Sequence, residues 1–236
     1  MMKKFFLLAA AFTVAMSAAA QVTFADDEDE NAQDGIGVQD PRKSTMSIGL
    51  KVGGNYSTMS KYDDVDLGLK GSVGFEAGAV ISARFGKRTK ASDAGTGAFG
   101  VQIEALYAQH TVKTDLNDDI KLTYFEVPIL AKYYFLPNFN VEAGVCIAGT
   151  LSSDPDKLTS TLNEPWPGRQ SVTFSTGDFK GFDIRPTIGL AYTVSNTGLG
   201  IGARYYLGTS EMAKNFPCKL NTIEVAISYS FNIFKF

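Results

Sequence analysis

The chain has 236 residues, a net charge of −3 and two cysteines, and aromatic residues make up 12% of it. The charge argues against the basic surface that nucleic-acid binding requires, so no nucleic acid is expected as a partner. Two cysteines are too few for a scaffold built on disulfides. The 23 glycines, together with many large side chains, favour a β protein with tight turns.

The first twenty residues have the order of a secretory signal peptide. Lys3 and Lys4 precede the apolar run 5–20, which ends in three alanines before Gln21. This run is shorter than the roughly 20 residues that a membrane-spanning helix prefers, so a retained anchor is the less favoured alternative. We therefore expect residues 1–20 to be a cleaved signal peptide.

Residues 21–44 form a separate polar region. Residues 26–30 read DDEDE, and the stretch that follows is polar as far as Ser44. Like charges repel each other and little here can be buried, so the pattern predicts a disordered tail in the periplasm. An acidic run without fixed spacing is more typical of a solvated tail than of a calcium site.

From residue 45 onward, apolar and polar residues alternate with a period of two. In residues 46–57, for example, Ile48, Leu50 and Val52 alternate with Ser47, Gly49 and Lys51. Each such segment predicts a strand with one apolar face. The same alternation recurs in residues 72–85, 99–110, 119–135, 139–151, 179–194, 198–208 and 221–233. Together these eight segments predict an all-β domain over residues 45–236.

Three features indicate that the apolar face points outward into lipid, as opposed to inward as in a secreted lipocalin-like barrel. The polar face is rich in Gly, Ser and Ala, which suits the narrow interior of eight strands. Aromatic residues gather toward strand ends. Short links at 136–138 and 195–197 contrast with long links at 59–69, 152–178 and 209–220. The prediction is an eight-stranded antiparallel up-and-down transmembrane β-barrel in a Gram-negative outer membrane.

Charged residues of both signs fall on the inward parity of these strands. Buried charges persist only when they are paired and hydrogen-bonded, so we expect a salt-bridge network across the lumen that blocks most solutes. A continuous pore is the less favoured alternative. The expected members are Lys51, Glu76, Arg84, Glu104, Glu126, Lys132, Glu142, Asp183, Arg185, Arg204 and Glu224.

Several segments resemble the PorT-like outer-membrane β-barrel domain of the Bacteroidetes. They are GLKVGGNYS at 49–57, GFEAG at 74–78, YFEVP at 124–128, FNVEAG at 139–144 and GARYYLG at 202–208. The resemblance covers about residues 45–236 and involves features of the barrel wall. It implies an eight-stranded outer-membrane barrel, usually of unassigned role. The family's namesake takes part in secretion across the outer membrane.

Two positions conflict locally with a regular barrel. Pro128 lies inside a predicted strand, where it forfeits a ladder hydrogen bond, so we expect a bulge or a missing bond there. Phe234 and the terminal Phe236 are out of phase with the outward series that ends at Phe231 and Ile233. Either a bulge reconciles them, or Phe231 is the functional end of the last strand.

Signals for catalysis or metal binding are weak. Residues 95–100 fit G-x-G-x-x-G but lead into a strand where a nucleotide site needs a helix. His110 is the only histidine, and no Ser-His-Asp spacing supports a lipid-modifying enzyme. Residues 63–66 read DDVD, which is more typical of a solvated loop than of a Ca²⁺ site. No cofactor or metal is expected, and a disulfide between Cys146 and Cys218 is geometrically awkward.

The long link 152–178 is the best candidate for an interaction site. Two short strand-like pieces, 157–162 and 170–175, flank NEPWPG and predict a hairpin. Trp166, the only tryptophan, lies at its tip between two prolines and close to Arg169. Exposed, rigid Trp is over-represented at binding hot spots, although it also packs on its own loop.

These observations favour a non-enzymatic structural or interaction protein that presents loops at the cell surface. An accessory subunit of a secretion or transport assembly and a lipid-modifying barrel enzyme are the alternatives. The expected partners are outer-membrane lipid or lipopolysaccharide, the barrel-assembly machinery during biogenesis, and a protein bound by the extracellular loops.

Overall fold

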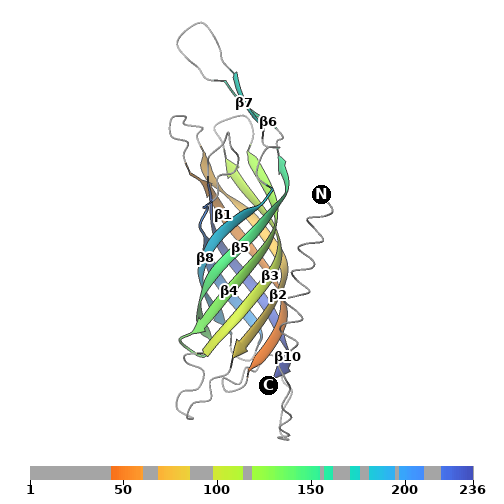
Figure 1. Ribbon diagram of the computed structural model, residues 1–236, viewed down its shortest axis with the longest axis vertical. Helices are drawn as coiled ribbons and strands as arrows, with labels where there is room; N and C mark the ends of the chain where they lie inside the picture. Colours follow the sequence, from red (N-terminus) through yellow and green to blue (C-terminus); the bar gives the residue numbers. More distant parts are fainter. Residues whose placement is uncertain are drawn as a thin grey trace, which may run out of the picture. The chain divides into compact units, whose positions relative to one another are not determined.

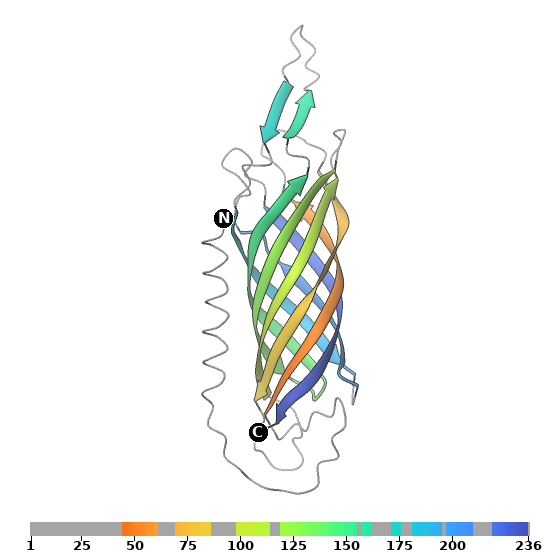
Figure 2. The same cartoon turned by 90° about the vertical axis from the view of Figure 1, so that its right-hand side faces the viewer.

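The computed structural model describes residues 44–60, 69–85, 98–113, 119–154, 157–161, 171–175, 181–194, 197–209 and 219–235. Within these ranges eight strands close into an antiparallel barrel, which confirms the predicted fold class (Figures 1 and 2). Among the same residues, no helix is long and apolar enough to cross a bilayer. The barrel strands are β1 (Thr45–Met59), β2 (Lys70–Phe85), β3 (Ala98–Lys113), β4 (Ile120–Tyr134), β5 (Phe139–Asp154), β8 (Asp183–Thr193), β9 (Leu199–Tyr206) and β10 (Leu220–Lys235).

Each barrel strand pairs with the barrel strands that precede and follow it, and β1 pairs with β10 to close the ring. We call the end where β1 begins and β10 ends the termini end, and the opposite end the loop end. The connections at the termini end include the turn 135–138. The long connection at the loop end between β5 and β8 contains β6 (Lys157–Thr161) and β7 (Ser171–Ser175), which pair antiparallel. The predicted hairpin is thus confirmed.

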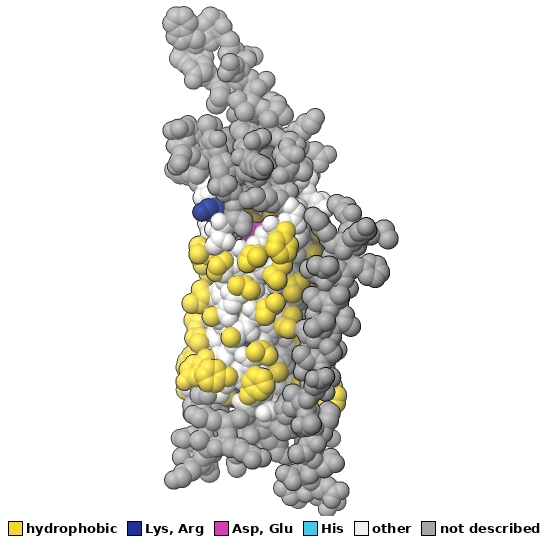
Figure 3. Space-filling model, in the orientation of Figure 1, with side chains coloured by type: hydrophobic (Ala, Val, Ile, Leu, Met, Phe, Trp, Pro, Cys, Tyr) yellow, Lys and Arg dark blue, Asp and Glu magenta, His cyan; other side chains and the backbone are white. Residues whose placement is uncertain are grey.

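The alternation of the sequence separates an apolar exterior from a polar interior. Large apolar side chains stand exposed on the outside, with Leu50 at 68%, Val73 at 70% and Ile188 at 63% of their full exposure. Figure 3 shows hydrophobic side chains over the visible face of the barrel wall. A soluble monomer rarely exposes a continuous apolar surface of this kind. The exterior therefore suits the hydrocarbon core of a bilayer.

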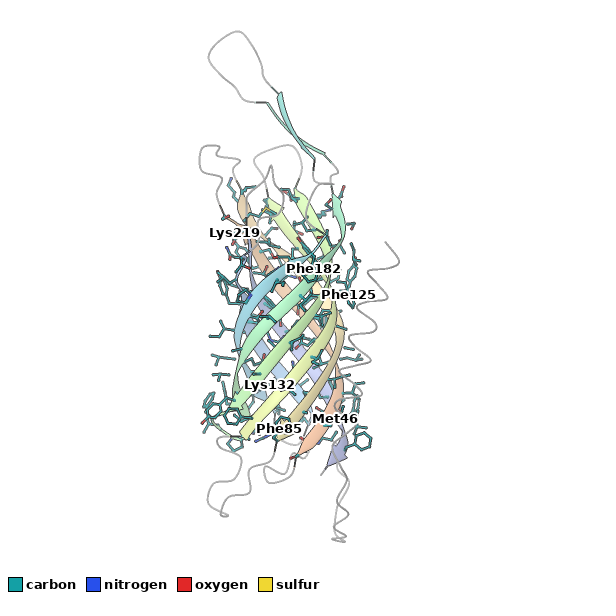
Figure 4. The ribbon with its side chains drawn as sticks, viewed as in Figure 1. Met46, Phe85, Phe125, Lys132, Phe182 and Lys219 are labelled. Carbon is teal, nitrogen blue, oxygen red and sulfur yellow. The ribbon has the colours of Figure 1, made fainter. Side chains whose placement is uncertain are left out.

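Aromatic rings pack against one another outside the barrel near the termini end. The ring of Phe139 lies 5.6 Å from that of Phe135 and 5.3 Å from that of Tyr192. Phe99 lies 5.2 Å from Tyr133 in the same way. Figure 4 shows Phe85 at this end of the wall and Phe182 nearer the loop end. Aromatic girdles of this kind are typical of barrels at the membrane interface.

Pro128 interrupts the pairing of β4 with β3 but not with β5. The β3–β4 register is the same on both sides of the gap, running to Ile103 opposite Ile129 and resuming with Leu106 opposite Glu126. On the other side, Pro128 stays opposite Cys146. Proline has no N–H to donate to the neighbouring strand. The expected defect is therefore a break in pairing, and not a bulge.

A bulge in β10 resolves the phase conflict at the C-terminus. Met46 lies opposite Phe234 and Ser47 opposite Asn232, so Ile233 is the additional residue of β10. Ile233 and Phe234 are 47% and 50% exposed, which shows that both face outward. One extra residue changes the side-chain parity of a strand, as a bulge is expected to do. Phe236 lies outside the described residues.

Inward-facing glycines differ in how much space surrounds them. A Cβ added at Gly144 would overlap the carbonyl oxygen of Ile129 and lie 2.9 Å from the Cα of Leu130. A Cβ added at Gly202 would lie 3.5 Å from the Cβ of Ala191, an ordinary contact. A side chain at residue 144 would therefore require the backbones of β4 and β5 to shift locally.

We predict that Gly144→Ala lowers the free energy of unfolding by about 1–3 kcal/mol, because the added methyl group overpacks the wall. Gly202→Ala is the matched control and should change it by less than about 0.5 kcal/mol. Urea titration of the refolded protein, followed by the shift in gel mobility on unfolding, measures both. Equal effects of the two variants would contradict this interpretation of Gly144.

Candidate functional site in the barrel lumen

Lys51 on β1 is one of the two centres of a buried charge network. Its Nζ lies 3.0 Å from Glu76, 3.0 Å from Glu104 and 2.5 Å from Glu224. These carboxylates come from β2, β3 and β10, and all of the side chains involved are almost fully buried. One ammonium group thus joins four strands across the lumen.

Arg204 on β9 is the second centre of this network. Its Nε lies 2.6 Å from Glu142 and its Nη2 lies 2.7 Å from Glu104. Its Nη1 is farther from Glu224, at 3.8 Å. Lys132 on β4 contacts the other oxygen of Glu142 at 3.0 Å. Because Lys51 and Arg204 share Glu104 and Glu224, all of these charges belong to one connected cluster.

Two neutral side chains complete this cluster. Gln102 donates a hydrogen bond to Glu104, and the hydroxyl group of Tyr206 donates one to Glu224. Both residues lie at inward positions of their strands. The alternation of the sequence indicates that they face the lumen, but it holds no signal for which carboxylate each would meet.

Arg185 on β8 organises a second buried cluster closer to the loop end. Its Nη1 lies 2.9 Å from Glu126, and its Nε lies 2.8 Å from Asp183. The guanidinium group also stacks over the ring of Tyr124, 4.8 Å from the ring centre. The side chain of Arg185 has no exposure to solvent. This arrangement pairs a buried cation with two carboxylates and an aromatic face.

His110 joins this second cluster through a chain of hydrogen bonds. Its Nδ1 lies 2.8 Å from the Oγ of Ser57, and its Nε2 lies 2.9 Å from Glu126. The Oγ of Ser57 also lies 3.1 Å from the Oγ1 of Thr222. Ser57, His110 and Glu126 come from β1, β3 and β4. Their spacing in the sequence therefore gave no sign that they would lie together.

The Ser57, His110 and Glu126 arrangement has the residue types of a hydrolytic triad. Its surroundings do not suit that chemistry, because Ser57 is completely buried and His110 is 1% exposed. A nucleophile must reach its substrate, and this hydroxyl group faces neither lipid nor solvent. The chain of contacts is therefore interpreted as part of the packed lumen.

Arg84 lies apart from both clusters, near the termini end. Its Nη1 donates a hydrogen bond of 3.1 Å to the carbonyl oxygen of Pro137. Its guanidinium group stacks on the ring of Tyr134, 4.2 Å from the ring centre. Arg84 thus contacts the turn after β4. The other ten predicted lumen charges belong to the network of Lys51 and Arg204 or to the cluster around Arg185.

Apolar side chains line the interior at the loop end. The last inward positions of β1 and β3 and the first of β4 and β10 carry large hydrophobic residues that are fully or almost fully buried. They are Met59, Val112, Ile120, Leu122 and Leu220. Charged clusters and an apolar layer therefore succeed each other along the barrel axis.

Several other predicted sites lie outside the described residues: Trp166, Arg169, residues 63–66, residues 95–97 and Cys218. Cys146 is buried in the wall, and its pairing with Cys218 stays untested. Within the described ranges no group of three or more His, Cys, Asp or Glu side chains could hold a metal ion.

We predict that Arg204→Met lowers the free energy of unfolding by about 3–5 kcal/mol, because it leaves buried carboxylates without their cation. The exposed Lys121 at the loop end is the control, and Lys121→Met should cost less than about 1 kcal/mol. Urea titration in lipid vesicles measures both. A loss below 1 kcal/mol for Arg204→Met would show that the network contributes little to stability.

Comparison with solved structures finds distant similarity over most of the chain. Ail, the attachment invasion locus protein of Yersinia pestis, crystallised with the heparin analogue sucrose octasulfate, is 15% identical, with a TM-score of 0.46. The match covers 79% of this chain and 99% of Ail. Neisserial surface protein A is 12% identical, with a TM-score of 0.41, over 79% of this chain and 97% of that protein. OprG from Pseudomonas aeruginosa is 10% identical, with a TM-score of 0.35, over 82% and 98%.

No curated protein matches the sequence. A family model, described as an outer membrane protein beta-barrel domain, matches residues 24–213. This range includes β1 to β9 of the barrel and most of the chain. The match agrees with the closed ring of strands, the apolar exterior and the polar lumen. The chain therefore belongs to the outer membrane protein β-barrel domain family.

Proposed function

We propose that this outer-membrane β-barrel is a non-enzymatic structural or interaction protein that acts through its extracellular loops. The observation that supports the proposal is the set of buried charges that pair with one another across the lumen. The network centred on Lys51 and Arg204, the cluster around Arg185 and the apolar layer occupy the space through which a solute would have to pass. A barrel without a passage and without an accessible catalytic group has its outer surface available for function.

The filled lumen acts as a plug because its charges are paired with one another. Lys51 and Arg204 connect carboxylates on four other strands. Moving these side chains aside would separate ion pairs that have little solvent to replace them. Thermal motion therefore seldom opens a path of the width that a hydrated solute needs.

The termini end faces the periplasm in this proposal, and residues 1–20 act as a cleaved signal peptide. The turn 135–138 and the connection between β8 and β9 are short, whereas the connection between β5 and β8 is long. Short periplasmic turns and longer external loops are the rule for outer-membrane barrels. The acidic segment 21–44 would then lie in the periplasm.

The loop between β5 and β8 is the proposed contact region for a protein partner. The backbone pairing of β6 with β7 gives this loop an ordered base. In the sequence, Trp166 and Arg169 lie between these two strands, and both residue types are enriched at binding hot spots. The exposed apolar wall and its aromatic rings contact outer-membrane lipid, including lipopolysaccharide, and the barrel-assembly machinery inserts the chain.

A role as an accessory subunit of a secretion or transport assembly is the second candidate. The observation that favours it is the resemblance of segments such as 49–57 and 202–208 to the PorT-like domain, whose namesake takes part in secretion. Both segments belong to the wall of the barrel, on β1 and on β9. In this case the partner would be another component of the membrane assembly.

A lipid-modifying enzyme is the least favoured candidate. Such an enzyme would need its catalytic groups on the lipid-facing side or at the rim of the barrel. His110 and Ser57 point into the lumen and are buried. The observed geometry therefore favours a non-enzymatic protein.

We predict that a variant lacking residues 157–175 folds into the barrel but loses its protein partner, because the proposed contact region is removed. Cells expressing the wild type and the variant are cross-linked, and the partners that co-purify in detergent are compared. Trp166→Ala should weaken recovery of the same partner. Lys121→Met, at the loop end but outside the hairpin, is the control that should leave recovery unchanged.

Heat-modifiable gel mobility confirms that each variant is folded before the comparison. Equal recovery by the wild type and the deletion variant would contradict a role for the hairpin. Recovery of secretion or transport components by both proteins would favour the second candidate, since binding would then depend on the barrel wall.

A further inference from the structure

Exposed charged side chains lie only at the loop end of the barrel, among the residues whose side chains the structure describes. They are Lys70, Lys113, Lys121, Lys219, Asp119 and Asp154. Figure 4 shows Lys219 at this end of the wall. Lysines outnumber aspartates in this set, so positive charge prevails where the described wall meets the extracellular side of the proposed orientation.

Two of these lysines lie directly opposite each other on neighbouring strands, and we call them the lysine pair. Lys70 at the start of β2 is paired with Lys113 at the end of β3. Residues opposite each other in an antiparallel pair point to the same face, and both of these side chains are exposed on the outer face. The register shifts between Gly71 and Phe75, where β2 has one residue more than β3. Without this bulge, the alternation that turns Phe75 outward would turn Lys70 inward.

The charges around the lysine pair differ from those farther round the ring. Lys121 on β4 lies opposite Asp154 on β5, so an acidic residue faces it in the pairing register. Asp119 comes just before β4, but within the described residues it forms no ion pair with Lys113. Two like charges directly opposite each other destabilise a sheet. An anion between the two ammonium groups would replace this repulsion with two charge-assisted contacts.

Below the lysine pair, the outer surface changes from polar to apolar. Gln109 and Thr111 occupy the next outward positions of β3 and are partly exposed. Tyr107 follows, and its ring centre lies 6.2 Å from that of Phe75 on β2. Val73, also on β2, is 70% exposed. A lipid with a phosphorylated head group has the same order of charged, polar and apolar parts along its length.

We propose that the lysine pair binds a phosphate group of lipid A, the membrane anchor of lipopolysaccharide, in the outer leaflet. The ammonium groups of Lys70 and Lys113 donate hydrogen bonds to the phosphate oxygens. The acyl chains lie along the apolar surface formed by Val73, Phe75 and Tyr107. The site deepens the proposed contact of the wall with lipopolysaccharide and rests on the proposed outward orientation of the loop end. It is independent of the protein partner of the hairpin.

Titration of the refolded protein in detergent with lipid A, followed by native mass spectrometry, tests the proposal. Lipid A that carries two phosphate groups is compared with a dephosphorylated form that has the same acyl chains. The wild type should bind the phosphorylated form at least tenfold more tightly. Raising the ionic strength should reduce this preference, because both ammonium groups are exposed to solvent.

Substitutions in the lysine pair should remove the preference for phosphate. Lys113→Met should weaken binding of phosphorylated lipid A about fivefold, and the Lys70→Met/Lys113→Met double variant more than tenfold, as the loss of interfacial cations predicts. Lys113→Arg keeps the charge and should bind like the wild type. Lys121→Met is the matched control for a lost lysine, since Lys121 faces Asp154, and should also bind like the wild type.

Three outcomes would overturn the proposal once heat-modifiable mobility has shown that each protein is folded. The first is equal affinity of the wild type for the two forms of lipid A. The second is an equal loss of binding in Lys121→Met and Lys113→Met, which would indicate attraction to net charge alone. The third is displacement of lipid A by an equal concentration of inorganic phosphate, which would mean that the lysines recognise free phosphate.

The orientation on which the site rests is tested separately in intact cells. A protease added outside should cleave the chain between β6 and β7, because the loop end faces outward in the proposed orientation. Absence of cleavage would contradict that orientation and the position of the site in the outer leaflet. Failure of lipid A binding by the purified protein would contradict the lysine pair alone, because detergent exposes both ends of the barrel to the lipid.

Discussion

The guanidinium group of Arg204 contacts carboxylates from three different strands, and the rest of the lumen is arranged around it. Glu104 and Glu142 lie within 2.7 Å of its nitrogens, and Glu224 is shared with Lys51. A barrel of eight strands leaves just enough interior for its own side chains. Charges in that space have each other as partners in place of bulk water, so their contacts join the strands across the lumen.

The interior is consequently arranged in layers along the barrel axis. The network of Lys51 and Arg204 lies nearer the termini end, and the cluster around Arg185 lies nearer the loop end. Apolar residues such as Ile120 and Leu122 complete the series at the loop end. The exterior has its own order, with aromatic rings near the membrane boundaries.

Much of this could be predicted from the sequence, because a strand with one apolar face has a period of two. That period identified the eight strands, the inward position of Lys51 and Arg204, and the phase conflict at Phe234. The defect at Pro128 was predicted because proline has no N–H to donate. The partners of each charge could not be predicted, because they depend on register and on the tilt of the strands. The hydrogen bond between Ser57 and His110 is the clearest example, since it joins β1 to β3 across 53 residues of the chain. Trp166 and Arg169 remain sequence-based candidates.

We propose that paired charges and the apolar layer together seal the lumen. Conductance across a planar lipid bilayer containing the refolded wild-type protein tests it most directly. A sealed lumen should give no discrete current steps in concentrated potassium chloride, even when folded protein is shown to be present in the bilayer. Uniform current steps whose size increases in proportion to the salt concentration would show a continuous water-filled path and would contradict it.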